Sequence, residues 1–444
     1  MERILRLRIH DCVKRAGIFL VVAAFIAGIM GCAPDSEPIP KYDLTVSSTA
    51  GGFPITPGEA IFTYNEGTVV DLVATPDAGY RFVNWTGDVD TIADINASST
   101  TITMNGNYSI TANFQAKGYT RKYENIASAD NMLIGAYYYP WYSGTTHWDE
   151  GYKDTPVLGE YNCRDEETIN IHIDWATGHG VDAFIMSWWG PYSWEDVTLK
   201  NHFLKASLAD EMEFCIHYET WGRLEVSVQG EVDLSNQSNR TRLIQDFKYL
   251  EETYFSDPGY LRIQGRPVVV IYLARTFVGD VEGAISELRG AMEEDVYLIA
   301  DIVYWQHPYS PRQRMLMGQF DAITSYNMHA SVEGIDDNFG DKFSQKYAEF
   351  LEVAEEIGVG FVPNLMPGFD DSPVRPEDAN PVIVRSPERF EGFCDAVLRC
   401  LDPKLNAVFI TSFNEWHEYT QIEPDENYGT TYLEIIREKL AGFL

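Results

Sequence analysis

Short apolar runs alternate with amphipathic stretches from residue 131 to residue 444. The apolar runs have the length of buried strands, and they lie at 134–139, 182–189, 213–219, 267–273, 296–303, 320–326, 360–365 and 407–413. Between them, apolar residues recur at helical spacing, as at Leu243, Phe247 and Leu250. Eight strands that alternate with helices predict an α/β fold, a (β/α)8 TIM barrel. An open, doubly wound sheet is the alternative, but no glycine-rich phosphate loop follows the first strand, so the barrel is favoured.

Residues 42–116 have a different pattern, which predicts a small N-terminal all-β domain. Its β-prone runs are separated by Gly, Pro, Asn and Asp, and they lie at 44–46, 69–74, 81–85, 101–104 and 109–114. We expect its core to contain Tyr80, Phe82, Trp85 and Phe114. Residues 32–41 are expected to be a spacer before this domain, and residues 117–130 a linker to the barrel at 131–444.

Residues 1–31 have the features of an export signal. Basic residues precede an uncharged apolar run, Ile18–Met30, which is too short for a comfortable membrane span but suits the core of a signal peptide. The stretch Ala27–Cys32 resembles a bacterial lipobox. We therefore expect cleavage before Cys32 and lipidation of this cysteine, with the exported protein anchored through its acyl chains at the bacterial cell envelope (outer membrane or cell surface). An ordinary secretory leader is the alternative.

The composition is that of a folded, acidic protein. Of the 444 residues, 45% are hydrophobic and 13% aromatic, which excludes a disordered chain. The 67 acidic residues exceed the 33 basic ones, and the net charge of −34 opposes binding of nucleic acid. The cysteines beyond Cys32 have no framework spacing, so we expect buried thiols at Cys163, Cys215, Cys394 and Cys400. We also expect a monomer.

Aromatic, amide and acidic residues gather where the predicted strands end, which is where reactive groups lie in such barrels. Six of the ten tryptophans are found there. Aromatic faces beside carboxylates and amides suit a saccharide, whose C–H faces stack on rings while its hydroxyls form hydrogen bonds. The candidates for binding an oligo- or polysaccharide substrate are Tyr139, Trp188, Trp189, His217, Glu219, Tyr272, Tyr326, Asn414 and Trp416. Side chains alternate along a strand, so Trp188 and Trp189 should divide between core and pocket.

Two acidic residues, Glu415 and Glu418, follow the last predicted strand. On an extended chain they would lie roughly 10 Å apart, whereas a helical turn after Phe413 would bring their β-carbons within about 5–6 Å. That spacing suits the catalytic pair of a retaining glycosidase, whose carboxyl groups lie roughly 5–5.5 Å apart. Glu352 and Glu355 have the same spacing on a predicted helix. The position at the barrel mouth therefore distinguishes the first pair.

Three segments of the predicted barrel resemble glycoside hydrolase family 99, which with the related family 71 includes endo-α-mannosidases and α-mannanases. Ser412–Glu418 reads Ser-Phe-Asn-Glu-Trp-His-Glu and, with Thr420–Pro424 after it, is similar to the family signature. Ala136–Tyr142, followed by His147 and Trp148, resembles the first-strand motif, and Gly180–Gly190 resembles the second. In the N-terminal domain, residues 79–85 and 108–114 resemble the internalin-type B-repeat modules of bacterial surface proteins. That resemblance implies a spacer or adhesive stalk, with sugar binding by Trp85 as the alternative to a core position.

The family 99 resemblance implies retaining hydrolysis of an internal α-mannoside without a metal or other cofactor. Glu415 would act as base on the sugar's own 2-hydroxyl, which attacks the anomeric carbon and forms a 1,2-anhydro sugar. Glu418 would protonate the leaving oxygen and then activate the water that opens the epoxide. Close like charges raise one pKa of such a pair, which keeps a proton available for the leaving group. Tyr326 would lie near the reacting centre, and Tyr139, His147 and Trp188 would contribute to sugar subsites.

Two departures from the family pattern leave the substrate open. Tyr419 replaces the glycine that usually follows the second glutamate, and the loop from Ser143 to Thr146 is shorter than the segment that carries distal-sugar contacts. The sequence therefore leaves the substrate undecided among a mannan, an α-glucan and another polysaccharide. It also leaves open whether the enzyme cuts within the chain or at its end.

Two other functions are compatible with the predicted barrel. Histidines at 217, 307, 329 and 417 lie near predicted strand ends, as in a metallohydrolase. However, the first strand has no His-x-His and no HExxH helix is present, so neutral, hydrogen-bonding histidines are favoured. A glycosyltransferase-like or non-catalytic carbohydrate-binding barrel is the second alternative. The absence of a nucleotide-sugar supply outside the cell weakens the transferase interpretation.

Overall fold

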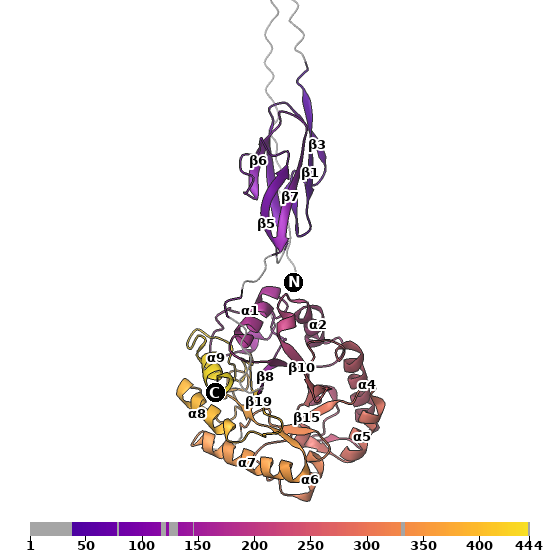
Figure 1. The fold of residues 1–444 in the computed structure, drawn as a ribbon, viewed down its shortest axis with the longest axis vertical. Coiled ribbons are helices and arrows are strands. Elements are labelled where there is room, and N and C mark those ends of the chain that lie inside the picture. Colours follow the sequence, from indigo (N-terminus) through magenta and orange to yellow (C-terminus); the bar gives the residue numbers. More distant parts are fainter. Residues whose placement is uncertain are drawn as a thin grey trace, which may run out of the picture. The chain divides into compact units, whose positions relative to one another are not determined.

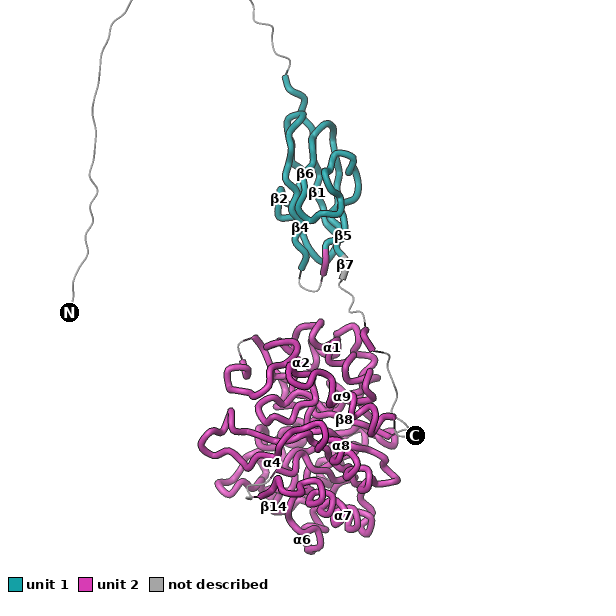
Figure 2. Tube along the Cα trace, turned by 90° about the vertical axis from the view of Figure 1, so that its left-hand side faces the viewer, with its two compact units in different colours: residues 1–77, 82–115 teal, residues 78–81, 116–444 magenta. Residues whose placement is uncertain are grey.

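The computed structural model describes residues 38–77, 80–116, 121–123, 132–144, 146–329 and 334–442 (Figure 1). The chain separates into two compact units, and the division falls near residue 115, as the colours of Figure 2 show. The expected signal peptide, the lipidation site at Cys32 and most of the expected linker lie outside the described residues. Among the described residues, none of the helices has the length and apolar character needed to span a lipid bilayer.

The described residues of the first unit form seven strands in two sheets. One sheet has the order β3-β1-β7-β5 and the other the order β2-β4-β6. The strands are β1 (Lys41–Ser48), β2 (Gly52–Thr56), β3 (Ile61–Asn65), β4 (Val69–Pro76), β5 (Tyr80–Gly87), β6 (Ser99–Thr103) and β7 (Tyr108–Ala116). Alternate residues of β4 are buried at Val70, Leu72 and Ala74, as expected for a strand with one face on a core. The expected all-β domain is confirmed, and β2 and β3 are additional strands whose residues are exposed or half-buried except for Pro54.

Trp85 lies in the core of this unit. Its side chain has no exposed surface, and its indole N–H donates a hydrogen bond to the carbonyl of Ala97 at 3.1 Å. Phe114 is also buried, whereas the expected core residues Tyr80 and Phe82 are half-buried. The alternative that Trp85 binds sugar is therefore wrong, because its ring is not accessible.

The second unit is a closed barrel of parallel strands. The chain order of the strands is β8 (Leu133–Tyr138), β9 (Ala183–Trp188), β10 (Glu213–Tyr218), β13 (Arg266–Ile271), β15 (Tyr297–Asp301), β16 (Ala322–Thr324), β17 (Gly360–Val362), β18 (Asn364–Leu365) and β19 (Ala407–Ile410). β17 and β18 are two halves of one barrel position, separated by Pro363. β17 pairs with β16, β18 pairs with β19, and β19 pairs with β8, which closes the ring of eight. The predicted (β/α)8 barrel is confirmed.

Helices surround the barrel in Figure 1. They are α1 (Glu166–Thr177), α2 (Trp194–Asn201), α3 (Thr220–Arg223), α4 (Gln237–Thr253), α5 (Val281–Ala291), α6 (Pro311–Met317), α7 (Phe339–Ile357), α8 (Pro387–Leu398) and α9 (Thr431–Ile436). The helical series of the sequence is buried as expected, for example at Leu243, Phe247 and Leu250 of α4. Side chains at the N-caps start several of these helices, as where Ser310 Oγ accepts a hydrogen bond from the backbone of α6.

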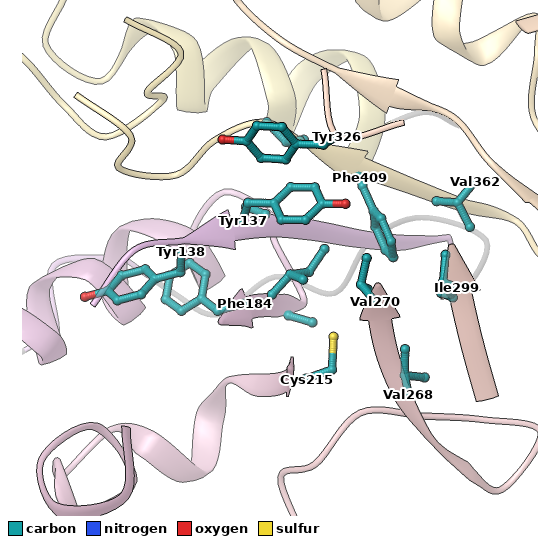
Figure 3. Close-up of a cluster of buried hydrophobic side chains, with 14 of the residues drawn as sticks. Tyr137, Tyr138, Phe184, Cys215, Val268, Val270, Ile299, Tyr326, Val362 and Phe409 are labelled. Carbon is teal, nitrogen blue, oxygen red and sulfur yellow. The ribbon is translucent and has the colours of Figure 1, made fainter. Parts of the chain in front are cut away.

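Aromatic and aliphatic side chains fill the barrel interior (Figure 3). Tyr137 points inward, where its ring lies 5.1 Å from that of Tyr326 and 6.0 Å from that of Phe409. Tyr138, the next residue, points to the other side of the strand and packs on Phe184 at 4.7 Å. The expected thiols at 163, 215, 394 and 400 are free and buried. The barrel is thus a solid core that supports a site at its rim.

Candidate active site

A cleft with a volume of about 500 Å³ opens at the C-terminal ends of the barrel strands. Tyr139, Trp189 and Glu219 each follow directly after a strand and line it. The full lining consists of Tyr139, Trp141, His147, Glu150, Trp189, Glu195, Glu219, Tyr272, Tyr326, Val374, Arg375, Glu415, His417 and Glu418. Most of the residues chosen from the sequence are therefore brought together at one place.

Glu415 and Glu418 both line this cleft, on the segment that follows β19. The expected helical turn is replaced by a tight turn over residues 416–419. Ser412 holds its start, because Ser412 Oγ accepts a hydrogen bond from the backbone N–H of Glu415 at 2.7 Å. Thr420 holds its end, with its backbone N–H donating to the carbonyl of Glu415 at 3.3 Å. This turn presents both carboxyl groups to the same space.

Three side chains contact the carboxyl group of Glu418. The hydroxyl of Tyr326 donates to Oε2 at 3.4 Å, and the side-chain amide of Asn327 donates to the same oxygen at 3.5 Å. Arg375 lies 3.7 Å from Oε1. Tyr139 in turn donates to the hydroxyl of Tyr326 at 2.5 Å. Glu418 therefore ends a chain of hydrogen bonds that crosses the cleft from the first strand.

The two glutamates are placed where neither ionises easily. Burial raises the pKa of Glu415 well above its usual value, and the nearby charge of Glu418 raises it further. Burial also raises the pKa of Glu418, to about 7, while the guanidinium of Arg375 opposes this rise. With both pKa values raised, the pair keeps a proton near neutral pH, and in the unliganded site Arg375 favours the carboxylate form at Glu418 and thus the proton on Glu415.

A third carboxyl group, that of Glu219, is oriented toward the cleft by hydrogen bonds. Ser187 Oγ donates to Oε1 of Glu219 at 2.7 Å and accepts from the indole N–H of Trp189 at 3.0 Å.

Glu150 and Glu195 lie further along the lining, and burial raises the pKa of Glu195. Five glutamates thus line the cleft with one fixed cation, Arg375. Such a lining favours neutral ligands over anions.

His147, Glu150 and His417 are the group in the described residues that could hold a metal ion. One ligand atom of each lies within 4.8 Å of the others. A carboxylate oxygen of Glu150 lies 3.2 Å from Nδ1 of His147, and the second oxygen lies 3.6 Å from Nδ1 of His417. Burial lowers the pKa of His417 to about 4, so its ring is neutral at physiological pH. The bridging carboxylate accounts for the cluster without an ion, and the expectation of a metal-free site stays a prediction.

Four of the residues expected to bind substrate lie beneath the cleft surface, which corrects those predictions. Trp188 has no exposed surface, and its indole N–H donates to Asp196 at 2.8 Å, so the ring belongs to the core while Trp189 reaches the cleft. Trp416 is buried with its N–H on Glu423 at 2.9 Å. His217 packs between rings of the barrel interior, 4.8 Å from that of Tyr137. Asn414 is fully buried, and its side chain bonds both backbone groups of Tyr139 and the hydroxyl of Tyr161.

Several lining residues were missed in the sequence. Trp141 stacks on His147, with ring centres 5.0 Å apart and an angle of 17° between the rings. Trp141 and His417 stand inside the motifs quoted for the family resemblance, so a signal for them was present. Glu195 lies at the start of α2 and Arg375 lies on a loop. Neither position has a distinguishing pattern in the sequence.

Comparison with known proteins assigns the second unit to a family. Residues 151–436 match a protein family described as glycosyltransferase WbsX. The chain belongs to this family. Residues 42–118 match the divergent InlB B-repeat domain, in agreement with the resemblance seen in the sequence.

Curated relatives of this WbsX-family protein include mannosidases. The glycoprotein endo-alpha-1,2-mannosidase of Rattus norvegicus is 23% identical over 359 residues, which are 71% of this chain and 73% of that protein. The uncharacterized protein WxcX of Xanthomonas campestris pv. campestris is 23% identical over 334 residues, which are 68% of this chain and 47% of that protein.

Solved structures share the barrel. The GH99 endo-alpha-mannosidase from Bacteroides thetaiotaomicron, in complex with bis-tris-propane, has a TM-score of 0.54 at 20% identity, covering 69% of this chain and 95% of that one. A glycoside hydrolase-like protein has a TM-score of 0.60 at 21% identity, covering 73% of this chain and 97% of that one. The expected likeness to glycoside hydrolase family 99 is therefore confirmed as a likeness in sequence and in fold.

Proposed function

We propose that this protein is a retaining glycoside hydrolase that cleaves within chains of α-mannosides. The observation that carries the proposal is the buried pair Glu415 and Glu418, which face one cleft and have raised pKa values. A pair of carboxyl groups that shares a proton supplies both the base and the acid that glycoside cleavage requires. The named relatives that are endo-α-mannosidases support the choice of substrate class.

In the proposed reaction Glu415 accepts the proton of the sugar's 2-hydroxyl as this oxygen attacks the anomeric carbon. The bond to the leaving oxygen breaks, and Glu418 donates a proton to that oxygen. A 1,2-anhydro sugar forms. Glu418, now a carboxylate, takes a proton from the water that attacks the anomeric carbon, while Glu415 returns its proton to the 2-oxygen as the epoxide opens. Tyr326, which donates to Glu418 at 3.4 Å, orients this carboxyl group.

This sequence of steps requires the shared proton on Glu418 when substrate is bound. In the unliganded site Arg375 favours it on Glu415, so binding must move it. The sugar's 2-hydroxyl, donating a hydrogen bond to Glu415, would stabilise the carboxylate form of Glu415 and lower its pKa. Substrate binding would thereby set the protonation state that the reaction needs.

Glycosyl transfer is the second candidate function, because it is the description of the family. A nucleotide-sugar donor carries a diphosphate, and the cleft is lined by five glutamates and one arginine. That charge opposes a diphosphate, since like charges in a partly desolvated cleft repel strongly. We therefore favour hydrolysis of a neutral saccharide.

We further propose that the protein is exported and lipidated at Cys32, with the barrel acting at the bacterial cell envelope as a monomer. The basic residues, the short apolar run and the lipobox-like stretch Ala27–Cys32 support this proposal. Labelling cells with a palmitate analogue tests it: label should enter the wild type, and a Cys32→Ala variant should stay unlabelled.

The proposed activity is tested by incubating the protein, without any nucleotide sugar, with α-mannans, α-glucans and other neutral polysaccharides. We expect shortened chains whose first-formed reducing end has the α configuration by NMR. Glu415→Gln and Glu418→Gln should each lose at least about a thousandfold in kcat, because each removes one of the two proton transfers of the proposed reaction. Glu388→Gln is the matched control and should retain full activity. Glu388 is an exposed residue of α8, and Glu391 follows it by three positions, as Glu418 follows Glu415. Wild-type turnover in either active-site variant, or no cleavage of any glycan, would reject the proposal.

A further inference from the structure

A tryptophan outside the cleft is exposed to solvent although its surroundings are rigid. Trp221 lies on the short helix α3, which begins directly after the cleft residue Glu219. Its side chain is 47% exposed, while Trp189, which lines the cleft, is 37% exposed. An exposed aromatic ring close to a saccharide-sized cleft can extend the surface that binds the sugar.

The two indole rings are linked through Gly222, the residue after Trp221. A β-carbon at Gly222 would lie 2.4 Å from Cε3 of Trp189, so only a glycine permits the ring of Trp189 to lie against α3. At the far side, a β-carbon on Gly230 would lie 3.4 Å from the ring of Trp221. Trp221 thus has backbone on one side and lies on the same short helix that supports Trp189.

Arg223 fixes this arrangement in place. Its guanidinium donates to the carbonyl of Trp189 at 3.2 Å and, in a two-pronged contact, to Asp246 of α4 at 2.9 and 2.8 Å. Tyr218, the last residue of β10, also donates to Asp246, at 3.0 Å. The segment that carries Trp189 and the helix that carries Trp221 are therefore joined before any ligand binds, which reduces the entropy cost of binding.

We propose that Trp221 forms an additional sugar-binding subsite, continuous with Trp189, for units of a polysaccharide chain that extend beyond the cleft. This inference rests on the proposed function and names its substrate as a neutral chain longer than the cleft can hold. Its occupant is a saccharide because Trp221 follows the cleft residue Glu219 by two positions, and because an apolar ring face suits the C–H face of a pyranose. The glutamates that line the adjoining cleft would disfavour anionic chains.

The test measures how kcat/KM depends on chain length. For Trp221→Ala we expect kcat/KM on long oligosaccharides and polymer to fall about 5- to 10-fold, the range expected for loss of one aromatic stacking contact. On the shortest oligosaccharide that the wild type cleaves, kcat/KM should be unchanged. Trp221→Phe, which keeps an aromatic face, should restore most of the loss on the polymer.

Trp194 offers a matched control on the same rim. It is 39% exposed, but the guanidinium of Arg164 lies 3.3 Å from its ring centre and covers one face of the ring. Trp194→Ala should therefore leave the chain-length dependence as in the wild type. Equal loss in both variants, or loss in Trp221→Ala that is the same for short and long substrates, overturns the inference while the proposed function stands. Absence of cleavage by the wild type on every glycan rejects the proposed function instead, and the inference with it.

Discussion

The side-chain amide of Asn414 is bonded to both backbone groups of Tyr139. Its Oδ1 accepts from the N–H of Tyr139 at 2.7 Å, and its Nδ2 donates to the carbonyl of Tyr139 at 3.0 Å. The two residues are 275 positions apart in the chain, and both are buried. This contact joins the end of the first barrel strand to the turn that carries Glu415 and Glu418. The hydroxyl of Tyr139 donates a hydrogen bond to the hydroxyl of Tyr326, which in turn donates one to Glu418.

Asn414→Ala should lower both stability and activity. It leaves the buried N–H of Tyr139 without a partner, which costs about 1–3 kcal/mol of unfolding free energy, and leaves its carbonyl with only the thiol of Cys163, at 3.6 Å. Because small displacements of catalytic groups are costly, kcat should fall roughly 10- to 100-fold while KM changes less. Urea unfolding and steady-state kinetics give the two numbers. Asn414→Asp, which keeps the acceptor and loses the donor, should be intermediate; wild-type values for the alanine variant would show that the contact does not position the turn.

Glu415→Gln should stabilise the protein at alkaline pH while it abolishes activity. The pKa of Glu415 is raised in the folded protein, mainly by burial, so folding disfavours its charged form. This cost is absent below the unfolded pKa of about 4.3 and is reached in full as the pH rises through the folded pKa. Thermal unfolding should therefore show a higher midpoint for the variant at pH 8 and little difference at pH 4. A gain of equal size at both pH values would point to packing rather than to the buried charge.

Arg375→Gln should move the alkaline limb of the pH profile of kcat/KM to higher pH. The guanidinium lies 3.7 Å from Glu418 and opposes the rise of its pKa, so its removal raises that pKa further. The pair then keeps its last proton to a higher pH, and the acid needed for the leaving group persists. Arg312→Gln, at an exposed arginine of α6, should leave the limb in place. A shift of the Arg375→Gln limb to lower pH would contradict the assigned electrostatics.

Much of this fold could be predicted because each buried parallel strand is a short, continuous apolar run between helices. Each of the eight predicted runs overlaps one barrel position, although Pro363 divides one of them into β17 and β18. Which of Trp188 and Trp189 faces the core could not be predicted. The alternation of side chains along a strand shows that the two point to opposite sides, but it does not show which side is the core. That choice depends on how the strand is tilted and staggered in the closed barrel.

The candidate site could be predicted at its centre and not at its edges. Glu415 and Glu418 follow a strand, so their place at the rim follows from the topology. Arg375 lies on a loop whose shape depends on Asp371, which accepts from Arg375 at 2.9 Å and from the backbone of Asn380 at 2.9 Å. Such contacts between side chains and backbone have no periodic signal in a sequence.

The conformation of Tyr419 gives a physical reason for the glycine that usually occupies this position in family 99. Its φ of 59° lies in the left-handed region, which costs a residue with a β-carbon about 1–2 kcal/mol relative to glycine. The ring lies 5.0 Å from the guanidinium of Arg385, a contact that offsets part of this cost. At the turn that carries Glu418, the tyrosine therefore strains the backbone, and the packing of its ring offsets part of that cost.

Comparison of Tyr419→Gly with Tyr419→Ala separates these two contributions. Both variants lose the ring, but only glycine relieves the backbone, so Tyr419→Gly should be more stable than Tyr419→Ala by about 1 kcal/mol in urea unfolding. The control is the same pair of substitutions at Glu391, an exposed residue within α8, where alanine should be the more stable by roughly 0.5–1 kcal/mol. Because the backbone of the turn is unchanged in Tyr419→Gly, this variant should also retain kcat. An alanine variant as stable as the glycine variant would mean that residue 419 shifts out of the left-handed region. The kcat values of the two variants would then show whether Glu418 moves with it.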